Sequence, residues 1–386
     1  MTDRRHEMTI VATAGVRADP GHRGMAPPIW CSDTYAWPDP DTKPAYDYAR
    51  SNNPNRDLLS QALAELEGAC GGVVTGAGQS AALLALLLVP AGGVVVAPHD
   101  CYGGTYRLIK GLADAGKLDA CFIDQADDAA FAAALALKPA MVWIETPSNP
   151  LLRLVDIADR AAKARAAGAI VVADNTLPTP CRQRPLALGC DLVMHSTSKA
   201  LNGHGDLIGG ALLAADPELL EKLIWWANAA GLTGPAHDAA QTLRGLRTLP
   251  LRVDRQEATA RRLAWWLQGN SLVTDVHYPD LPSHPDHALA QRQQTGPGFV
   301  LSFRLQGGLA ASGAFLSALR IPTLAASLGS FGTLICRPAT MTHAGMPPEA
   351  RAAAGIADDL IRLSVGLEEP EDLLADLARG FAAIAR

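Results

Sequence analysis

The chain has 386 residues, a length that favours a large domain plus a smaller one over a single ordinary domain. Apolar residues make up 48% of it, enough for an extensive core, and its formal net charge of −6 comes without a basic run. This balance argues against nucleic acid as a partner and favours a small-molecule substrate.

The seven cysteines form no C-x-x-C pair and no Cys/His spacing typical of zinc. We therefore expect reduced thiols, no metal and a cytoplasmic protein. The longest apolar run, residues 81–98, is interrupted by Pro90 and two glycines. It predicts a helix followed by a strand and not a membrane span.

The first 56 residues are typical of an extended arm, since they contain many prolines and aromatic residues and no sustained helical period. Within this arm, Tyr48 and Arg50 lie in a polar turn. Such a turn is usually a solvated loop, but the planar fork of an arginine also suits a phosphate.

From Asp57 the pattern alternates between helical and strand-like segments. Leucines and alanines recur at helical spacing over residues 57–66, and Gly68 marks the end of that helix. Further expected helices are 79–89, 105–114, 127–135 and 157–166, and the expected strands are 73–74, 94–97, 120–123, 140–144, 170–173 and 192–194. This alternation predicts an α/β fold with a mostly parallel sheet covered by helices on both faces.

Three loops at the ends of expected strands hold polar residues. The loop of residues 75–80 leads Gly78 and Gln79 into a helix, whose first backbone N–H groups favour an anion. The next two loops contain Tyr102, which is suited to stack on a flat ring, and Asn149, a hydrogen-bond donor. Each loop also has the composition of an ordinary turn.

The most informative stretch is 191–206, where an apolar strand leads into three hydroxyl residues, a lysine and a glycine-rich turn. Ligands of open α/β sheets gather at such strand ends. Ser196 and Ser198 can donate to a phosphate, and the amine of Lys199 can form a Schiff base with an aldehyde once its pKa is lowered. Taken alone, the same residues also fit a solvated lysine beside capping serines.

A second strand end gives this lysine its context. The apolar strand before Asp174 ends on that acid, and a carboxylate there can keep a pyridine nitrogen protonated. Asp174 alone also fits a helix or turn cap. Together, Lys199 and Asp174 make pyridoxal phosphate the leading cofactor hypothesis, because that cofactor uses both groups.

One motif supports a different class of enzyme. Residues 76–81 match G-x-G-x-x-A after a strand, with Asp100 downstream, as in nicotinamide-dinucleotide sites. A dinucleotide oxidoreductase would leave Lys199 and Asp174 without a role. One phosphate and one pyridine ring use every strand end described above, so we favour pyridoxal phosphate.

Past residue 210 the expected elements are a helix at 218–230, a helical region at 236–268, strand-like runs at 272–277 and 299–303, a helix at 309–319 and a glycine-rich segment at 327–332. The last motif is 360–368, where Arg362 interrupts an apolar strand. A buried positive charge needs a partner, and a substrate carboxylate held bidentately would supply one. An internal salt bridge fits the local sequence equally well.

These residues resemble the Cys/Met-metabolism, pyridoxal-phosphate-dependent (transsulfuration) enzyme family, from about Met8 to Phe381. The Ser-x-Ser-Lys and Tyr-x-Arg motifs are shared by the whole family. The segments 99–104, 147–153, 225–228 and 342–346 look closest to its cystathionine γ-synthase group. The resemblance implies fold type I, with a mostly parallel seven-stranded-type sheet between helices and a smaller α+β C-terminal domain.

The resemblance also implies a role for each candidate residue. Lys199 would form the Schiff base and later move protons, Asp174 would pair with the ring nitrogen, and Tyr102 would stack on the ring. The phosphate would be held by Gly78, Gln79, Ser196 and Ser198, with Tyr48 and Arg50 reaching the phosphate of an adjacent subunit. Asn149 would lie near the phenolic oxygen, and the substrate would contact Arg362, Ser327, Arg107, Asn228 and Asn149.

The implied domains are an N-terminal arm at 1–56 that contacts a neighbouring subunit, a cofactor-binding α/β domain at 57–255 and a C-terminal α+β domain at 256–386. The implied partners are a small amino acid and further copies of the chain in a homotetramer. The implied reaction is γ-replacement of an O-acyl-L-homoserine by L-cysteine, which gives L-cystathionine.

One departure from the family pattern keeps a second reaction open. Relatives usually have a glutamate where this chain has Gly332, and that acid is thought to receive the distal amino group of cysteine or cystathionine. The alternative is a γ- or β-lyase that eliminates from cystathionine, methionine or another γ-substituted amino acid such as canavanine, releasing a 2-oxo acid and ammonia.

Overall fold

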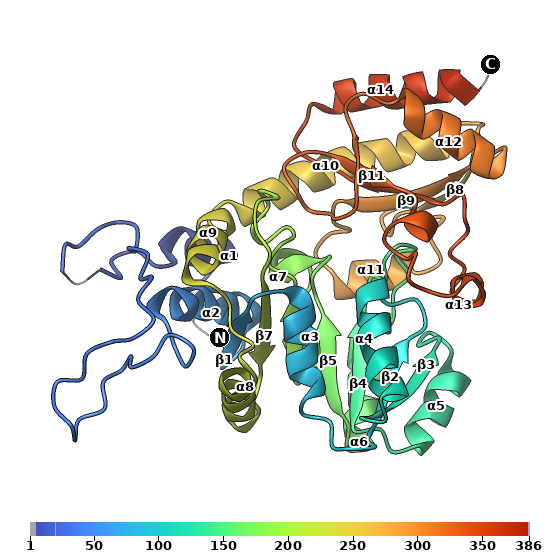
Figure 1. Ribbon diagram of the computed structural model, residues 1–386. Coiled ribbons are helices and arrows are strands. Elements are labelled where there is room, and N and C mark those ends of the chain that lie inside the picture. Colours follow the sequence, from blue (N-terminus) through green and yellow to red (C-terminus); the bar gives the residue numbers. More distant parts are fainter. Residues whose placement is uncertain (1–4, 20, 385–386) are drawn as a thin grey trace. The chain divides into compact units, whose positions relative to one another are not determined.

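The computed structural model of the chain describes residues 5–19 and 21–384. The chain divides into two compact units (Figure 1). The first unit consists of Met1–Pro90 and Ile170–Pro250, and the second of Ala91–Ala169 and Leu251–Arg386. The domain limits expected at residues 56 and 255 stay a prediction, and their outermost residues lie outside the described ranges.

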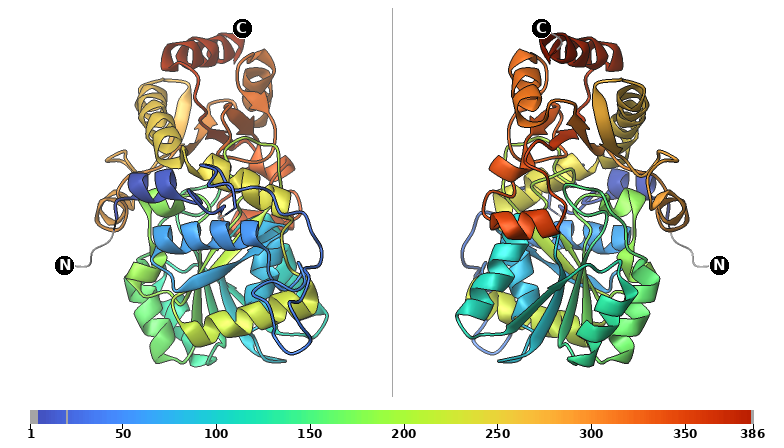
Figure 2. Two further views of the ribbon diagram at one scale, coloured as in Figure 1. Left: turned by 90° about the vertical axis from the view of Figure 1, so that its left-hand side faces the viewer. Right: turned by 90° about the vertical axis from the view of Figure 1, so that its right-hand side faces the viewer.

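The first unit contains four strands and helices of very different length. Its strands are β1 (Gly71–Thr75), β5 (Ile170–Asp174), β6 (Leu192–His195) and β7 (Gly210–Ala214). Its helices are α1 (Glu7–Thr13), α2 (Pro54–Glu67), α3 (Gly78–Leu86), α7 (Thr179–Arg182), η1 (Pro185–Leu188), α8 (Pro217–Ala230) and α9 (Ala236–Leu246). α2 packs against α9 and β1, as Figures 1 and 2 show.

α2 illustrates how local chemistry sets the bounds of these elements. Asn53 accepts hydrogen bonds from the N–H groups of Asn55 and Arg56 at 3.0 and 3.3 Å, and Pro54 occupies the first turn. Gly68 ends the helix with φ +79°, a conformation that glycine adopts without strain. The helix predicted over 57–66 is therefore confirmed, and it starts three residues earlier.

The second unit contains two groups of strands. The first group is β2 (Val94–Pro98), β3 (Asp119–Ile123) and β4 (Met141–Glu145), and the second is β8 (Val273–His277), β9 (Val300–Leu305), β10 (Thr323–Leu324), β11 (Leu334–Cys336) and β12 (Ile361–Ser364). Its helices are α4 (Gly103–Asp114), α5 (Asp128–Ala136), α6 (Ile157–Ala166), most of α10 (Leu249–Gln268), α11 (His287–Gln293), α12 (Gly308–Ala318), η2 (Pro338–Thr340), α13 (Pro348–Ala353) and α14 (Pro370–Ile384).

The strand order confirms the predicted fold class. Strands β1 to β7 form a seven-stranded sheet in the order β1-β7-β6-β5-β4-β2-β3. The pairs β5–β6, β2–β4 and β2–β3 are parallel, whereas β7 is antiparallel to both β1 and β6. A second sheet has the order β10-β11-β12-β9-β8, and α12 and α14 pack side by side in the same unit, orange and red in Figure 2.

Several elements were not predicted. α1 interrupts the arm that we expected to be extended, and β7, α11, α13 and α14 lie in segments without a prediction. The helical region expected at 236–268 is two helices, α9 and α10, separated by Arg247 and Thr248. None of the seven cysteines, all of which lie in the described ranges, forms a disulfide; five of them are buried or half-buried, while Cys31 and Cys70 are exposed. Within the described residues no helix is long and apolar enough to cross a membrane.

Candidate active site

The predicted site residues fall into two groups, one in each unit. The first unit holds Tyr48, Arg50, Gly78, Gln79, Asp174, Ser196, Ser198, Lys199 and Asn228. The second unit holds Tyr102, Arg107, Asn149, Ser327 and Arg362.

The start of α3 has the features of an anion site. Ala77 precedes the helix, and no side chain caps the first turn. The first backbone N–H groups of α3 are therefore available to an anion. A Cβ added to Gly78 would lie 2.8 Å from Cβ of Ser196 and 3.0 Å from its Oγ. Only glycine therefore allows this close approach, which sets Ser196 beside the helix start.

The two serines of the motif are held differently. Ser198 Oγ accepts a hydrogen bond from the N–H of Gly209 at 2.9 Å and donates one to its carbonyl at 3.2 Å. The N–H of Ser196 donates to Thr176 Oγ1 at 2.8 Å, but Ser196 Oγ has no partner among residues 5–19 and 21–384. The hydroxyl of Ser196 is thus available to a phosphate, whereas the hydroxyl of Ser198 already binds the backbone of Gly209.

Asp174 is a buried acid at the end of β5. Its Oδ1 accepts a hydrogen bond from the N–H of Thr176 at 3.0 Å. Burial raises the pKa of the Asp174 carboxyl, while the hydrogen bonds from Thr176 and the charge of His195 act in the opposite direction. A pyridinium nitrogen placed against this carboxylate would favour its ionised form further, so the residue fits the predicted role.

Lys199 sits in a tight turn after β6. Its backbone N–H donates to the carbonyl of Ser196 at 3.2 Å, and its carbonyl accepts from the N–H of Gly203 at 2.8 Å. The side chain is half-buried. The turn therefore fixes the lysine backbone in the same unit as Asp174 and the start of α3.

Tyr48, Arg50 and Asn228 form one cluster in the first unit. Arg50 Nη1 donates to the carbonyl oxygen and to Oδ1 of Asn228, both at 2.8 Å. The guanidinium lies 5.4 Å from the ring centroid of Tyr48, whose side chain is exposed. Within this chain, Arg50 thus binds Asn228, and the predicted contact of Tyr48 and Arg50 with a neighbouring subunit stays a prediction.

Arg362 is buried in β12 without a counter-charge. Its Nη1 donates to Oδ1 of Asn149 at 2.9 Å, and its Nη2 donates to the carbonyl of Ser327 at 2.6 Å. In the part of the chain that the structure describes, Arg362 forms no ion pair and its Nε has no hydrogen-bond partner. The alternative of an internal salt bridge is therefore wrong, and the buried charge is left for a ligand.

Ser327 contributes its backbone carbonyl to this arrangement. Its φ is +94°, in the region that favours glycine, and a non-glycine residue there is strained by about 1–3 kcal/mol. This conformation is the one in which the Ser327 carbonyl accepts from Arg362. Strain of this kind is concentrated at ligand sites, which supports the prediction that Ser327 belongs to one.

Tyr102 and Arg107 belong to the start of α4. The N–H of Tyr102 donates to Oε2 of Glu145 at 2.8 Å, while its side chain remains partly exposed. A Cβ added to Gly345 would lie 2.9 Å from Cδ and Nη1 of Arg107, so the arginine stem runs along this glycine. The backbone of Thr342 approaches Gly103 in the same way.

Two features of the site were missed from the sequence. Glu67 and His195 form a fully buried pair in the first unit, with 2.7 Å between Oε1 and Nε2. In the second unit, burial and then the charge of Arg362 lower the pKa of His343 to about 4, so this histidine is neutral near pH 7. Glu67 and His195 are 128 positions apart, so their pairing leaves no local signal in the sequence.

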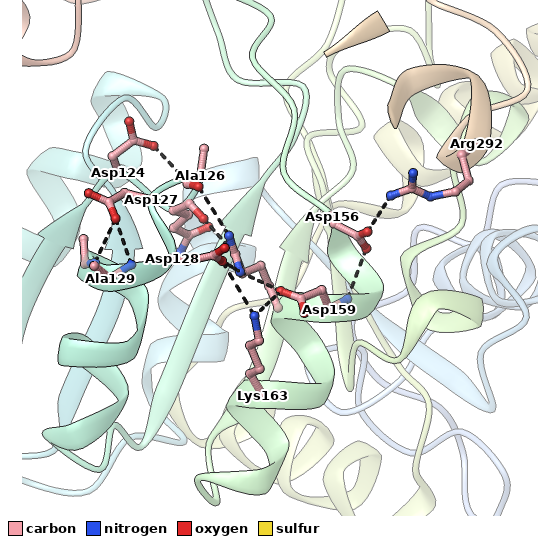
Figure 3. Close-up of polar contacts among 12 residues, drawn as sticks. Asp124, Ala126, Asp127, Asp128, Ala129, Asp156, Asp159, Lys163 and Arg292 are labelled. Atoms are coloured by element: carbon pink, nitrogen blue, oxygen red, sulfur yellow. Dashed lines mark hydrogen bonds and ion pairs between the residues drawn. The ribbon is translucent and has the colours of Figure 1, made fainter. Parts of the chain in front are cut away.

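A further polar cluster in the second unit is held together by ion pairs and helix caps (Figure 3). Lys163 Nζ lies 2.8 Å from Asp159 and 3.7 Å from Asp128, and Arg292 Nη2 lies 2.6 Å from Asp156. Asp156 also caps α6. We interpret this cluster as structural, since each of its cations is paired with an acid and Asp127 and Asp156 cap helices.

Comparison with known proteins decides the family. The family model described as Cys/Met metabolism PLP-dependent enzyme matches residues 8–382. The chain belongs to this family. Pyridoxal 5'-phosphate is therefore its cofactor, and the uncapped start of α3, Ser196 and the buried Asp174 fit the phosphate and the ring nitrogen of that group.

Individual relatives carry several transsulfuration activities. The chain is 48% identical to the cystathionine gamma-synthase of Escherichia coli over 98% of both chains, and 40% identical to the cystathionine beta-lyase of Coxiella burnetii over 97% of both. Among solved structures it is similar to the cystathionine gamma synthase of Xanthomonas oryzae pv. oryzae in complex with aminoacrylate and cysteine, with a TM-score of 0.98, 48% identity and 99% of both chains covered. The predicted family, fold type and cofactor are confirmed.

Proposed function

We propose that the chain replaces the γ-substituent of an O-acyl-L-homoserine by L-cysteine and so produces L-cystathionine. The observation that carries this proposal is Arg362, a buried guanidinium without a carboxylate partner in the described part of the chain. Every α-amino acid brings the carboxylate that this site lacks. The likeness to γ-synthases at 48% identity supports the choice of reaction within the family.

The residues of the first unit would bind the cofactor and move protons. When bound, pyridoxal phosphate supplies an electron sink for negative charge at the substrate Cα. The N–H groups of Gly78 and Gln79, with Ser196 and Ser198, would hold the phosphate. Lys199 Nζ would take the proton from Cα and return it.

Asp174 and Tyr102 would complete the binding of the ring. The Asp174 carboxylate would hold the proton on the ring nitrogen, because an ionised acid there stabilises the protonated ring. Tyr102, whose side chain is partly exposed, would cover one face of the ring.

Arg362 would orient the substrate. Asn149 and the Ser327 carbonyl each occupy one N–H of a terminal nitrogen, which leaves Nε–H and the remaining N–H groups for the substrate carboxylate. Two partners that fix the guanidinium plane lower the entropy cost of binding. Arg107 and Asn228 would lie farther out in the substrate pocket.

A lyase is the second candidate, and the surroundings of Gly332 favour it. The nearest acid, Glu368, accepts a hydrogen bond from the N–H of Thr333 at 2.7 Å and another from its hydroxyl at 2.7 Å. Both carboxylate oxygens are thus committed to Thr333. Gly332 itself offers no carboxylate to the distal amino group of a second amino acid, and Glu368 offers only the lone pairs that Thr333 does not use.

A substrate panel decides between the two reactions. Purified protein is given O-acetyl- and O-succinyl-L-homoserine with and without cysteine, and then cystathionine, methionine and canavanine, while cystathionine and 2-oxo acids are measured. A γ-synthase forms cystathionine and releases less 2-oxo acid when cysteine is added. Release of 2-oxo acid that cysteine does not reduce would establish the lyase. Lys199→Ala is the control and should abolish every activity.

We also propose that the chain forms a cytoplasmic homotetramer built from two dimers. The arm exposes Met25, Ile29 and Trp37, and the neighbouring Tyr48 and Arg50 lie in a surface cluster, as expected of an interface between copies. Light scattering of the purified protein should give four times the chain mass. A fully active monomer would contradict the proposal.

A further inference from the structure

The strands β9 and β12 of the second unit have one apolar face and one polar face. Successive side chains of a strand point to opposite faces of its sheet. The apolar face contributes to a buried core through Leu301, Phe303, Ile361 and Leu363. Ser302, Arg362 and Ser364 alternate with these residues, so they point to the opposite face.

Ser302 and Arg362 are neighbours on this polar face. They are paired in the register of the two antiparallel strands, and side chains of paired residues lie side by side. The two residues contact consecutive positions of the loop between β4 and α6. Ser302 Oγ donates to the carbonyl of Pro150 at 2.7 Å, and Arg362 Nη1 donates to Oδ1 of Asn149 at 2.9 Å. This loop is thus attached to the sheet at two adjacent points.

Ser364 has the equivalent position for the second acceptor of Arg362. It lies two residues beyond Arg362 on β12, and its Oγ accepts a hydrogen bond from the N–H of Gly329 at 2.9 Å. Gly329 comes two residues after Ser327, whose carbonyl accepts from Arg362 Nη2 at 2.6 Å. Each acceptor of the guanidinium therefore belongs to a segment that is bound by a buried serine of the same sheet face.

The orientation of Arg362 depends on these two segments. Asn149 and Ser327 both lie outside helices and strands, where the backbone is more mobile unless other contacts restrain it. A long arginine side chain has many rotamers, and a guanidinium that is oriented before its ligand arrives loses less entropy on binding. Hydrogen bonds that restrain both acceptors therefore favour binding of a carboxylate by Arg362.

We propose that Ser302 and Ser364 are positioning residues for the substrate carboxylate. They restrain the segments of Asn149 and Ser327, and these two acceptors hold the Arg362 guanidinium in the orientation that binds the carboxylate. The inference rests on the proposed role of Arg362 and extends it by two residues. Neither serine touches the substrate in this scheme.

The experiment compares two ligands of the cofactor-loaded enzyme. Glycine has the amino and carboxylate groups that all amino-acid substrates share, and methylamine is glycine without the carboxylate. Each is titrated while the absorbance of the bound cofactor is followed. In Ser302→Ala and in Ser364→Ala, the Kd of glycine should rise about fivefold to tenfold, which corresponds to about 1–1.4 kcal/mol. The Kd of methylamine should stay within about twofold of the wild-type value.

Ser312→Ala is the matched control. Ser312 is a fully buried serine of the same unit, and its hydroxyl donates to the carbonyl of Leu309 at 3.0 Å within α12, a helix without any predicted site residue. The change removes a hydrogen bond of the same kind, so it should leave both Kd values as in the wild type. Thermal unfolding of each variant checks that the fold is intact.

A double variant shows whether the serines act through Arg362. In the Arg362→Met background, the added Ser302→Ala change should alter the Kd of glycine by less than about twofold, because the residue that it orients is absent. Equal losses of affinity for glycine and methylamine would indicate a merely structural role and overturn the proposal. A folded Ser302→Ala or Ser364→Ala protein with the wild-type Kd for glycine, or losses that multiply in the double variant, would also overturn it.

Failure of the proposed function gives a different result. If Arg362→Met alone binds glycine as the wild type does, Arg362 does not hold the carboxylate, whatever the serines do. Should Ser302→Ala not fold, Ser302→Cys takes its place, since a thiol is a similar but weaker donor. Its Kd for glycine should also rise while that of methylamine does not, and a wild-type Kd for glycine would again contradict the proposal.

Discussion

Two buried arginines of the second unit differ in what surrounds them. Arg160 is 6% exposed and Arg362 is 2% exposed. Arg160 lies 2.7 Å from Asp128 and 2.6 Å from Asp159, and its Nε donates to the carbonyl of Gln125 at 2.8 Å. Arg362 has only an amide oxygen and a carbonyl oxygen as partners, and no carboxylate in the described residues.

The difference separates a structural charge from a binding charge. Removing a guanidinium from water is costly, and Arg160 recovers that cost within the chain through two acids and backbone carbonyls. Arg362 does not, so its charge remains uncompensated until an anion arrives. The partners of a buried cation, and not its degree of burial, thus indicate its role.

Arg362→Met should have the largest effect on activity. Loss of two charge-assisted hydrogen bonds to the substrate carboxylate should lower kcat/KM by roughly 10²- to 10³-fold. The free energy of unfolding should change by less than about 1 kcal/mol, because removal of an uncompensated buried charge offsets the loss of the donor to Asn149 and to the Ser327 carbonyl. Steady-state kinetics and urea denaturation measure the two quantities. A variant with kcat/KM within threefold of the wild type would refute the assignment.

Arg160→Met should show the reverse behaviour. The carbonyls of Gln125 and Ala126 lose their donor, so the free energy of unfolding should fall by about 2–3 kcal/mol. The value of kcat/KM, measured well below the unfolding temperature, should not change. If activity falls while stability holds, the contrast between the two arginines is mistaken.

The pH dependence of stability should reveal how the charge of Arg362 affects the pKa of His343. Its pKa in the folded chain is lowered to about 4, so the unfolded chain takes up this proton first as the pH falls below about 6.5. His343 therefore contributes stability above pH 6.5 that is lost between about 6.5 and 4, at up to about 1.4 kcal/mol per pH unit.

Arg362→Met should weaken this loss, because the pKa of His343 rises when the neighbouring positive charge is removed. Urea denaturation of both proteins at several pH values between 7 and 4.5 measures the two slopes. Parallel curves would show that the charge of Arg362 does not reach His343.

Asp128→Asn should have the smallest effect. Asp128 is an exposed partner of Arg160, whose hydrogen bond and charge lower the pKa of this acid. Solvent and salt screen such a pair, and Asp159 remains in place, so the melting temperature should change by at most about 2 °C. A larger shift, measured at 0.15 M salt, would mean that Arg160 depends on its exposed partner more than its backbone contacts suggest.

Much of the fold follows from local patterns in the sequence. α6 matches the predicted 157–166, because Asp156 caps its start and the turn at Gly168 follows its end. β7 was not predicted, since Gly210–Ala214 lacks the β-branched and aromatic residues that mark strands. α1 was missed because the helix is only seven residues long and lies in a segment rich in turn signals.

The site was only partly predictable, for a different reason. Asp174 ends β5 and Lys199 follows shortly after the end of β6, so the apolar strands in the sequence place both residues at strand ends. Whether Arg362 is paired with a carboxylate depends on which side chains surround it in space. The contact between Glu67 and His195 depends on how α2 packs in the first unit. Neither property is encoded in neighbouring residues, and both required the structure.

The start of α3, which no side chain caps, has a consequence for how long the enzyme would retain its cofactor. On the proposed assignments, the N–H groups of Gly78 and Gln79 would hold the phosphate of the cofactor by non-covalent contacts that do not depend on Lys199. Main-chain amides neither titrate near neutral pH nor change rotamer, so these contacts would persist through every proton transfer. A single cofactor molecule would therefore remain in place over many rounds of catalysis.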